Sequence, residues 1–207
     1  MQIVLASASP RRQELLRNAA LEFVVKPANI PEIPLEHEAA RDFAERMARE
    51  KARAVWNQEI GRNSTTKDTN FHEGPQEQKD LYVIGADTVV VVQDQVLGKP
   101  ENEEDAARML RLLSDREHQV ITGVCLLGSG FEDVRSETTA VQFSALTECE
   151  INDYVRSGEP VDKAGAYAIQ GMASRWISKV EGDYSNVVGL PVELLLQMLR
   201  EHGAIRS

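Results

Sequence analysis

Two adjacent arginines stand where a helix normally favours acidic residues. In LASASPRRQELL, residues 5–16, Ser9 can cap a helix that begins at Pro10, so Arg11 and Arg12 fall in its first turn. The positive end of the helix dipole disfavours cations in that turn. A bound phosphate would remove the conflict, because free backbone N–H groups, serine hydroxyls and guanidinium groups could all contact it. The alternative is a pair of solvated arginines on a surface helix.

A single aspartate interrupts a strongly apolar strand pattern. Asp87 lies in VIGADTVVVV, where a charged carboxylate needs a strong partner or a shifted pKa. The pattern indicates a metal ligand or a general base. It is equally typical of an aspartate capped by local N–H groups at a strand bend, which Gly85 would permit. In a regular strand Thr88 points to the opposite face.

Further polar residues could complete a site for an anion. Lys51 lies in a helical pattern and Lys99 follows the Asp87 strand in VLGKP. Each lysine alone is typical of a solvated surface, but together with the two arginines they could form a local positive cluster. The segment EPVDKAGAYAIQG carries a possible charged site at Asp162 and Lys163. It also carries Gln170, whose amide suits recognition of a nucleobase edge or, alternatively, satisfies backbone groups in a turn.

The composition restricts the class of protein. The chain has 207 residues, 42% of them hydrophobic, which is enough for a core in one domain or in two joined lobes. A formal charge of −10 disfavours binding of nucleic acid through bulk charge. The two cysteines have no metal or redox spacing. The apolar runs are too short for a signal peptide or a membrane span, so we expect a cytoplasmic protein.

Alternating strand and helix patterns predict an α/β fold around a mixed sheet. Strands are expected at 2–6, 22–27, 81–93, 118–128, 133–146 and 175–182. Helices are expected at 10–20, 35–58, 102–114, 147–158 and 190–203, the fourth with a capping box of Thr147 and Glu150. Residues 61–80 are polar with one aromatic residue, and they predict a surface insertion in a single domain of residues 1–207.

Taken in order, these segments resemble the Maf family of nucleoside triphosphate pyrophosphatases. The matching stretches run from residue 3 to about 199 and are LASASPRRQELL, AREKARAV, IGADTVVVV, LGKP, AARMLRLLSDREHQVITGV, EPVDKAGAYAIQG and GDYSNVVGLPVELL. The resemblance implies a mixed twisted sheet with flanking helices, in two lobes around a central cleft, akin to the inosine triphosphate pyrophosphatases. It also implies hydrolysis of a nucleoside triphosphate to the monophosphate and pyrophosphate, aided by Mg²⁺ or Mn²⁺, and a homodimer.

The resemblance also implies roles for individual residues. Four of them would bind the triphosphate: Ser7, Arg12, Lys51 and Lys99. Asp87 would be the catalytic carboxylate that activates water and would contact the metal. Glu32 falls where the family has an acidic residue near the metal, although the local string ANIPEIP lacks the common Asp-Glu pair.

Three positions separate the branches of the family. Here they carry Arg11, Thr88 and Gln170, a combination that resembles the branch cleaving dTTP and UTP, with clearance of non-standard nucleotides as a wider role. The string QGMASRWI departs from the family, where glycine commonly follows Gln-Gly by one or two places. The alternatives are a pyrophosphatase that prefers a modified nucleotide and a non-catalytic nucleotide-binding regulator of cell division. The intact set of charged residues favours catalysis.

Overall fold

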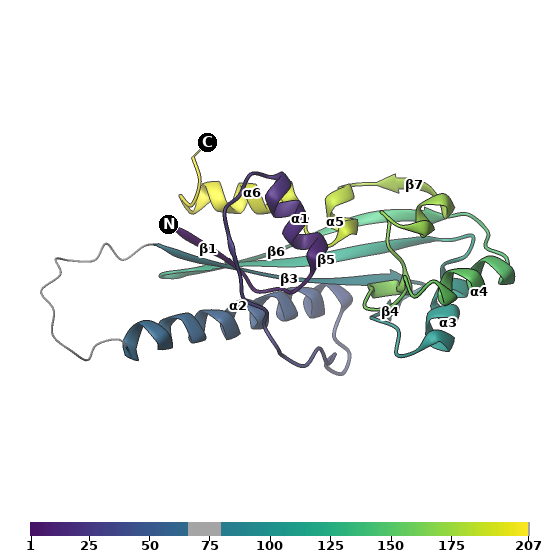
Figure 1. The fold of residues 1–207 in the computed structure, drawn as a ribbon, viewed down its shortest axis with the longest axis horizontal. Helices are drawn as coiled ribbons and strands as arrows, with labels where there is room; N and C mark the ends of the chain where they lie inside the picture. Colours follow the sequence, from purple (N-terminus) through teal and green to yellow (C-terminus); the bar gives the residue numbers. More distant parts are fainter. Residues whose placement is uncertain (66–79, 207) are drawn as a thin grey trace, which may run out of the picture.

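The computed structural model describes residues 1–65 and 80–206, in which seven strands form one mixed sheet with helices on both faces (Figure 1). The strands are β1 (Gln2–Leu5), β2 (Val24–Val25), β3 (Leu81–Val92), β4 (Gln95–Leu97), β5 (Glu117–Gly128), β6 (Phe131–Phe143) and β7 (Ile177–Glu181). The helices are α1 (Pro10–Asn18), α2 (Ala40–Thr65), α3 (Glu103–Leu113), α4 (Glu148–Arg156), α5 (Tyr184–Val188) and α6 (Val192–Glu201), with 3₁₀ helices at Ala164–Ala166 and Met172–Trp176. Among the described helices, none is long and apolar enough to cross a membrane.

Strand β3 has two different partners along one of its edges. The sheet order is β2-β1-β3-β5-β6-β7, and β4 also pairs with β3. The parallel strand β1 covers residues 81–84 of that edge, and the antiparallel strand β4 covers residues 90–92. Within the described chain, residues 85–89 therefore have a strand partner only on the β5 side. This gap in the ladder leaves the middle of β3, which carries Asp87, accessible from the side.

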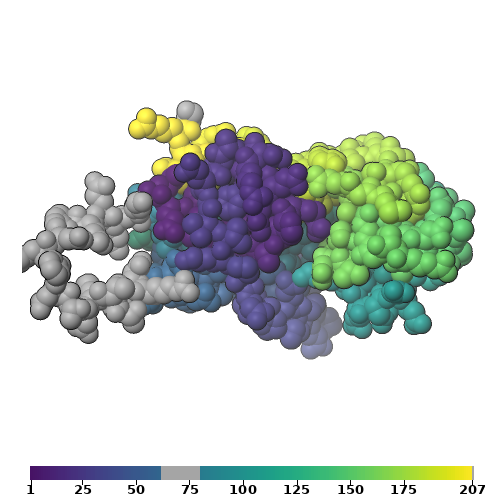
Figure 2. All heavy atoms as spheres, in the orientation of Figure 1, coloured from purple at the N-terminus to yellow at the C-terminus, as the bar shows by residue number. Residues whose placement is uncertain are grey.

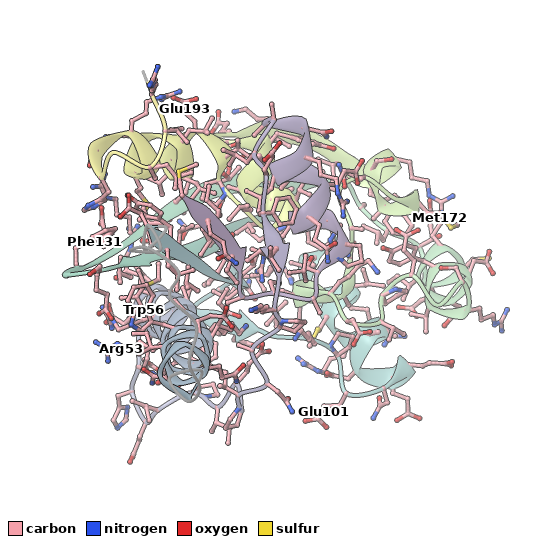
Figure 3. The ribbon with its side chains drawn as sticks, turned by 60° about the vertical axis from the view of Figure 1, so that its left-hand side comes forward. Arg53, Trp56, Glu101, Phe131, Met172 and Glu193 are labelled. Atoms are coloured by element: carbon pink, nitrogen blue, oxygen red, sulfur yellow. The ribbon has the colours of Figure 1, made fainter. Side chains whose placement is uncertain are left out.

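The two faces of β3 pack against different helices, because side chains alternate along a strand. On one face, Val83 packs with Ala48 and Ala52 of α2. On the other face, the side chains of Ile84 and Ala86 belong to a cluster that also contains residues of α1 and α6. Figure 3 shows α2, seen nearly along its axis, on the opposite side of the sheet from α6. A third cluster fills the end of the sheet that lies against α3 and α4 (Figure 1).

Helix α2 lies unusually close to the sheet because glycine and alanine meet at the contact. A Cβ atom added to Gly85 of β3 would lie 2.0 Å from the carbonyl oxygen of Ala48. A Cβ atom added to Gly123 of β5 would lie 2.4 Å from the carbonyl oxygen of Ala44. The backbone of α2 thus rests directly on the backbone of two neighbouring strands, and this contact sets the height of every other α2 side chain above the sheet.

The predicted α/β class with a mixed sheet and flanking helices is confirmed, and so is the capping box of Thr147 and Glu150 at the start of α4. The division into two lobes and the single domain of residues 1–207 stay predictions. The short strand β4 and the helix α5 were not expected from the sequence. Residues 22–27 form only the two-residue strand β2, and the closing helix α6 is shorter than the predicted 190–203.

The prediction for the long helix was wrong at both ends. It begins at Ala40 rather than at 35, because His37 has a φ of 59°, which is incompatible with a right-handed helix. It continues to Thr65, so residues 61–65 of the predicted polar insertion are helical. Gly61 costs only about 1 kcal/mol relative to alanine in a helix and does not end this one. Residues 66–79 of the predicted insertion lie outside the described residues.

The contact of α2 with the sheet predicts that Gly85→Ala destabilises the protein by about 3 kcal/mol, because the new methyl group meets backbone atoms that cannot rotate away. Urea-induced unfolding measures the effect. Gly98→Ala is the matched control, since a Cβ atom there meets nothing within 4 Å, and it should change the free energy of unfolding by less than about 0.5 kcal/mol. Equal effects of the two substitutions would contradict the close contact.

Candidate active site

All nine residues that the sequence singled out for the site line one cavity of about 750 Å³ beside the gap in the β3 ladder. They are Ser7, Arg11, Arg12, Glu32, Lys51, Asp87, Thr88, Lys99 and Gln170. The cavity wall combines the N-terminal segment with the segment around residues 162–170, which lie beside one another on the face shown in Figure 2 in purple and green. The structure therefore brings residues from distant parts of the chain to one place, while their individual roles stay predictions.

The ammonium group of Lys51 lies between two carboxylates. Its Nζ atom is 2.6 Å from Oδ1 of Asp87 and 2.6 Å from Oε1 of Glu32. The other oxygen of Glu32, Oε2, accepts a hydrogen bond of 2.9 Å from Nζ of Lys99. Lys51 and Asp87 are each only 7% exposed, so their charges are compensated inside the protein rather than by water. A buried ion pair of this kind is costly to break, because either partner alone would be an uncompensated charge.

The two lysines keep Glu32 ionised. Burial alone would raise the pKa of Glu32, but the hydrogen bonds and positive charges of Lys51 and Lys99 lower it to about 2. Basic and acidic side chains therefore alternate in this part of the cavity, in the order Lys99, Glu32, Lys51 and Asp87. The formal charges balance without any ligand.

Arg12 is bound mainly by the protein itself. Its Nε atom donates to the carbonyl oxygen of Gly189 at 2.7 Å. Its Nη1 atom donates to the carbonyl oxygen of Ala86 at 2.9 Å and to Oγ of Ser7 at 3.2 Å. Its Nη2 atom donates to Oγ1 of Thr88 at 3.0 Å. Four of the five N–H donors are thus used within the described chain, and one N–H on Nη2 remains for the predicted contact with a triphosphate.

The charge of Arg12 is withdrawn from solvent. Burial lowers the pKa of the guanidinium below its ordinary value, and the negative charges of Asp87 and Glu32 counteract part of that effect. Gly189 follows the last residue of α5, so Arg12 donates to a carbonyl at the negative end of that helix. Arg12 therefore connects three elements: α1, the unpaired edge of β3 and the end of α5.

The serines at the start of α1 accept hydrogen bonds from the backbone. Ser9 is the N-cap, as the sequence predicted, and its Oγ atom accepts from the backbone N–H of Arg12 at 3.4 Å. The Oγ atom of Ser7, only 8% exposed, accepts from the backbone N–H of Ser9 at 3.2 Å. Both hydroxyl groups act as acceptors in these bonds, so their protons stay available for an anionic ligand.

The three positions expected to set specificity differ in what they can still offer. The hydroxyl of Thr88 accepts from Arg12 and lies 3.0 Å from Oγ1 of Thr122, on the face opposite Asp87, as expected for a regular strand. The side chains of Arg11 and Gln170, in contrast, have no hydrogen bond or ion pair to any described residue. Their donors and the Gln170 carbonyl are free for a ligand. Of the charged pair noted in the sequence, Lys163 donates to a carbonyl of its own loop rather than to Asp162.

The cavity fits a divalent cation in one specific way. Asp87 and Glu32 each lie within 2.6 Å of one shared cation, the Nζ atom of Lys51, so both carboxylates reach the same position. Among residues 1–65 and 80–206, however, no group of three or more His, Cys, Asp or Glu side chains could hold a metal ion. Mg²⁺ is commonly bound by one or two carboxylates together with substrate phosphates and water. The two carboxylates therefore fit a metal whose other ligands come from a substrate.

The turn bearing Gln170 is held by side chains that the sequence did not single out. The hydroxyl of Tyr154 donates to Oε1 of Glu159 at 2.9 Å and accepts from the backbone N–H of Ala168 at 3.3 Å. The carboxylate of Glu159 accepts from the backbone N–H of Met172 at 3.0 Å. Nothing in the local sequence SGEPVDK distinguishes this glutamate from a solvated loop residue, because its partners lie on other segments.

The contacts of Arg12 predict that Arg12→Lys destabilises the protein even without ligand. Lysine retains the charge, but its donors all lie on one terminal nitrogen, whereas Nε and Nη1 of the arginine reach the separate carbonyls of Gly189 and Ala86. One or both carbonyls therefore lose their partner, at a cost of about 3 kcal/mol. Urea-induced unfolding tests this. Arg17→Lys, on the exposed face of the same helix, is the control and should change little. An Arg12→Lys variant as stable as the wild type would show that the arginine serves the ligand alone.

Comparison with known proteins places these observations in context. The model of a family described as Maf-like protein matches residues 2–202. A protein of Koribacter versatilis named dTTP/UTP pyrophosphatase is 49% identical over 205 residues, which cover 99% of this chain and 96% of that protein. A protein of the same name from a Geobacillus species is 45% identical over 202 residues, covering 98% of each chain. Another, from Geobacter sulfurreducens, is 44% identical over 206 residues, covering 99% of this chain and 98% of that protein.

Proposed function

Because this chain belongs to the Maf family, we propose that it hydrolyses the nucleoside triphosphates dTTP and UTP to the monophosphate and pyrophosphate. The observation that carries the proposal is the buried carboxylate of Asp87, held 2.6 Å from Lys51 at a cavity lined by further cations and free N–H and hydroxyl donors. The names of the full-length relatives support the substrate class.

In the proposed reaction, the anhydride bond between the α- and β-phosphates breaks. Asp87 orients the attacking water and accepts its proton, while the bridging oxygen leaves with the pyrophosphate. Before the substrate and metal bind, Lys51 holds the Asp87 carboxylate in place through their hydrogen bond of 2.6 Å. The hydroxyls of Ser7 and Ser9, the remaining N–H of Arg12 and the ammonium of Lys99 donate to the phosphate oxygens. Each charge-assisted hydrogen bond contributes about 1.5–3 kcal/mol.

Asp87 and Glu32 would hold the divalent metal, Mg²⁺ or Mn²⁺. When bound, the metal neutralises negative charge on the phosphate oxygens. The alternation of lysines and carboxylates supports this assignment, because it provides two ionised oxygen ligands together with two ammonium groups. In the proposed complex Lys51 and Lys99 exchange part of their pairing with the carboxylates for contacts to phosphate.

Base selectivity is proposed to depend on the free donors and acceptor of Arg11 and Gln170. Uracil and thymine present two carbonyl acceptors that flank one N–H donor, and the Gln170 amide supplies both a donor and an acceptor. Thr88 contributes indirectly, since its hydroxyl is bound to Arg12 and lies beside Thr122. Cytosine replaces one carbonyl and the N–H by an amino group and a bare nitrogen, so the same groups would be mispaired.

A homodimer, a cytoplasmic location and the absence of a nucleic-acid partner complete the proposal. The resemblance to the family supports the dimer, and the formal charge of −10 argues against binding to a polyanion. Light scattering coupled to size-exclusion chromatography tests the dimer directly.

The role of Asp87 predicts that Asp87→Asn lowers the turnover of dTTP by at least about 10²-fold, because an amide cannot accept the proton from water. The variant should remain folded, since Lys51 keeps Glu32 as a partner. Release of pyrophosphate is measured in the presence of Mg²⁺ or Mn²⁺. Asp94→Asn, in the turn between β3 and β4, is the control and should retain the wild-type rate. Undiminished turnover by Asp87→Asn would reject the catalytic role of Asp87. Binding of dTTP without release of pyrophosphate by the wild type would favour the regulator instead.

The base model predicts that the wild type hydrolyses dTTP and UTP well ahead of CTP and GTP. Mispaired buried polar groups can cost a factor as large as about 10⁴ in kcat/KM. Gln170→Glu should reduce the margin, because a carboxylate lacks the amide donor. A panel of dTTP, UTP, CTP, GTP and 7-methyl-GTP decides the substrate. Equal rates with CTP and dTTP would overturn the base model, and a marked preference for the methylated nucleotide would favour the alternative branch.

A further inference from the structure

The residue expected to recognise the base stands at the tip of a tight turn. The backbone N–H of Gly171 donates to the carbonyl oxygen of Ala168 at 3.1 Å, which closes a turn with Ile169 and Gln170 at its centre. The Ile169 side chain is 6% exposed and packs into the core, whereas Gln170 is exposed and lines the cavity. The Gln170 amide makes no hydrogen bond to a described residue. Its place in the cavity therefore depends on the backbone of the turn.

Two connected side chains hold both ends of this turn. The Tyr154 hydroxyl accepts from the N–H of Ala168 before the turn, at 3.3 Å. The Glu159 carboxylate accepts from the N–H of Met172 after it, with Oε1 at 3.0 Å and Oε2 at 3.1 Å. Tyr154 also donates to Oε1 of Glu159 at 2.9 Å, so the two side chains form one unit. We call this pair the clamp.

The clamp fits the turn closely. A Cβ atom added to Gly171 would lie 1.9 Å from Oε1 of Glu159, so the carboxylate rests directly against the turn backbone. Met172 is 45% exposed and is labelled at the outer surface in Figure 3. Glu159 contacts its backbone N–H. The hydrogen bond of Glu159 to residue 172 thus depends on the backbone geometry of the turn rather than on the Met172 side chain.

Rigid packing supports the clamp from behind. Tyr154 of α4 is fully buried and lies edge-to-face against Trp176, with ring centroids 5.1 Å apart. The indole N–H of Trp176 donates to Glu150, the capping-box residue at the start of α4. Burial and the neighbouring Glu159 raise the pKa of Tyr154, so the phenol keeps the proton that it donates. The Tyr154 side of the clamp is therefore fixed to α4, and Glu159 lies in the turn that follows this helix.

We propose that Tyr154 and Glu159 are positioning residues that set nucleobase selectivity by fixing the turn that presents Gln170 to the base. The inference rests on the proposed function. Neither side chain is among the residues that line the cavity, so they act through the backbone of residues 168–172. The clamp holds the amide where it can meet the carbonyl and N–H of uracil or thymine. A looser turn would let the amide reorient and accept cytosine.

The test compares kcat/KM for dTTP with that for CTP in Glu159→Gln and Tyr154→Phe. Each variant keeps the shape of the side chain but removes at least one hydrogen bond of the clamp. The ratio should fall about tenfold, with the larger part of the change in the KM for dTTP, because a small displacement of a positioning group is enough for such a loss. Glu148→Gln is the matched control: it alters an exposed carboxylate of α4, the helix that carries Tyr154. Glu148 pairs with Arg111, and its substitution should leave the ratio unchanged.

A double-mutant cycle separates positioning from general destabilisation. In a Gln170→Ala background, Glu159→Gln should produce no further loss of selectivity, because the group it positions is gone. An unchanged ratio in both clamp variants, or full additivity with Gln170→Ala, would overturn the proposal.

If the proposed function is wrong, the wild type releases no pyrophosphate from any nucleotide. In that case calorimetric binding of dTMP and dCMP replaces turnover. Loss of the preference for dTMP in Glu159→Gln would still support the clamp, and an unchanged preference would reject it.

Discussion

The contact on which the site depends is the one between the backbone of α2 and the backbone of the sheet. Glycines on β3 and β5 meet alanines on α2, so no side chain separates the helix from the strands. Lys51 follows Ala48 by one turn, and Asp87 follows Gly85 by two residues on the same face. Only at this short separation can the ammonium reach the carboxylate at 2.6 Å. A helix held one side chain farther away would leave a buried carboxylate without its partner, which is among the most destabilising arrangements in a protein interior.

The gap in the β3 ladder opens the pair of Lys51 and Asp87 to the cavity. Strands β1 and β4 cover only the two ends of one edge of β3. Asp87 and Thr88 are adjacent and point to opposite faces of β3, yet both line the cavity beside the uncovered part of this edge. Arg12 occupies the gap and binds the free carbonyl of Ala86. It also resolves the conflict at the start of α1, since its charge is satisfied by a carbonyl at the end of α5. The unfavourable position on one helix is compensated by a favourable position on another.

Much of the site could be predicted because its residues are locally anomalous: an aspartate in an apolar strand and arginines in a first helical turn are visible without a structure. Their partners were not predictable, because the bonds of Lys51 to Glu32 and of Arg12 to Gly189 join segments that no local pattern relates. The contacts of the clamp with the turn of residues 168–172 could not be predicted for the same reason. The start of α2 was misplaced because the left-handed backbone of His37 is not evident from its residue type.

The hydrogen bond between Arg12 and Gly189 has a consequence for folding during synthesis of the protein. The two residues are 177 positions apart, so a ribosome that adds about 5–20 residues per second needs roughly 10–35 s to supply the acceptor after the donor. Until then α1 lacks its partner on α5, and the cavity lacks part of its wall. A nascent chain therefore stays without a complete pocket until Gly189 has been added. Binding of a ligand in the complete pocket has to wait for that residue.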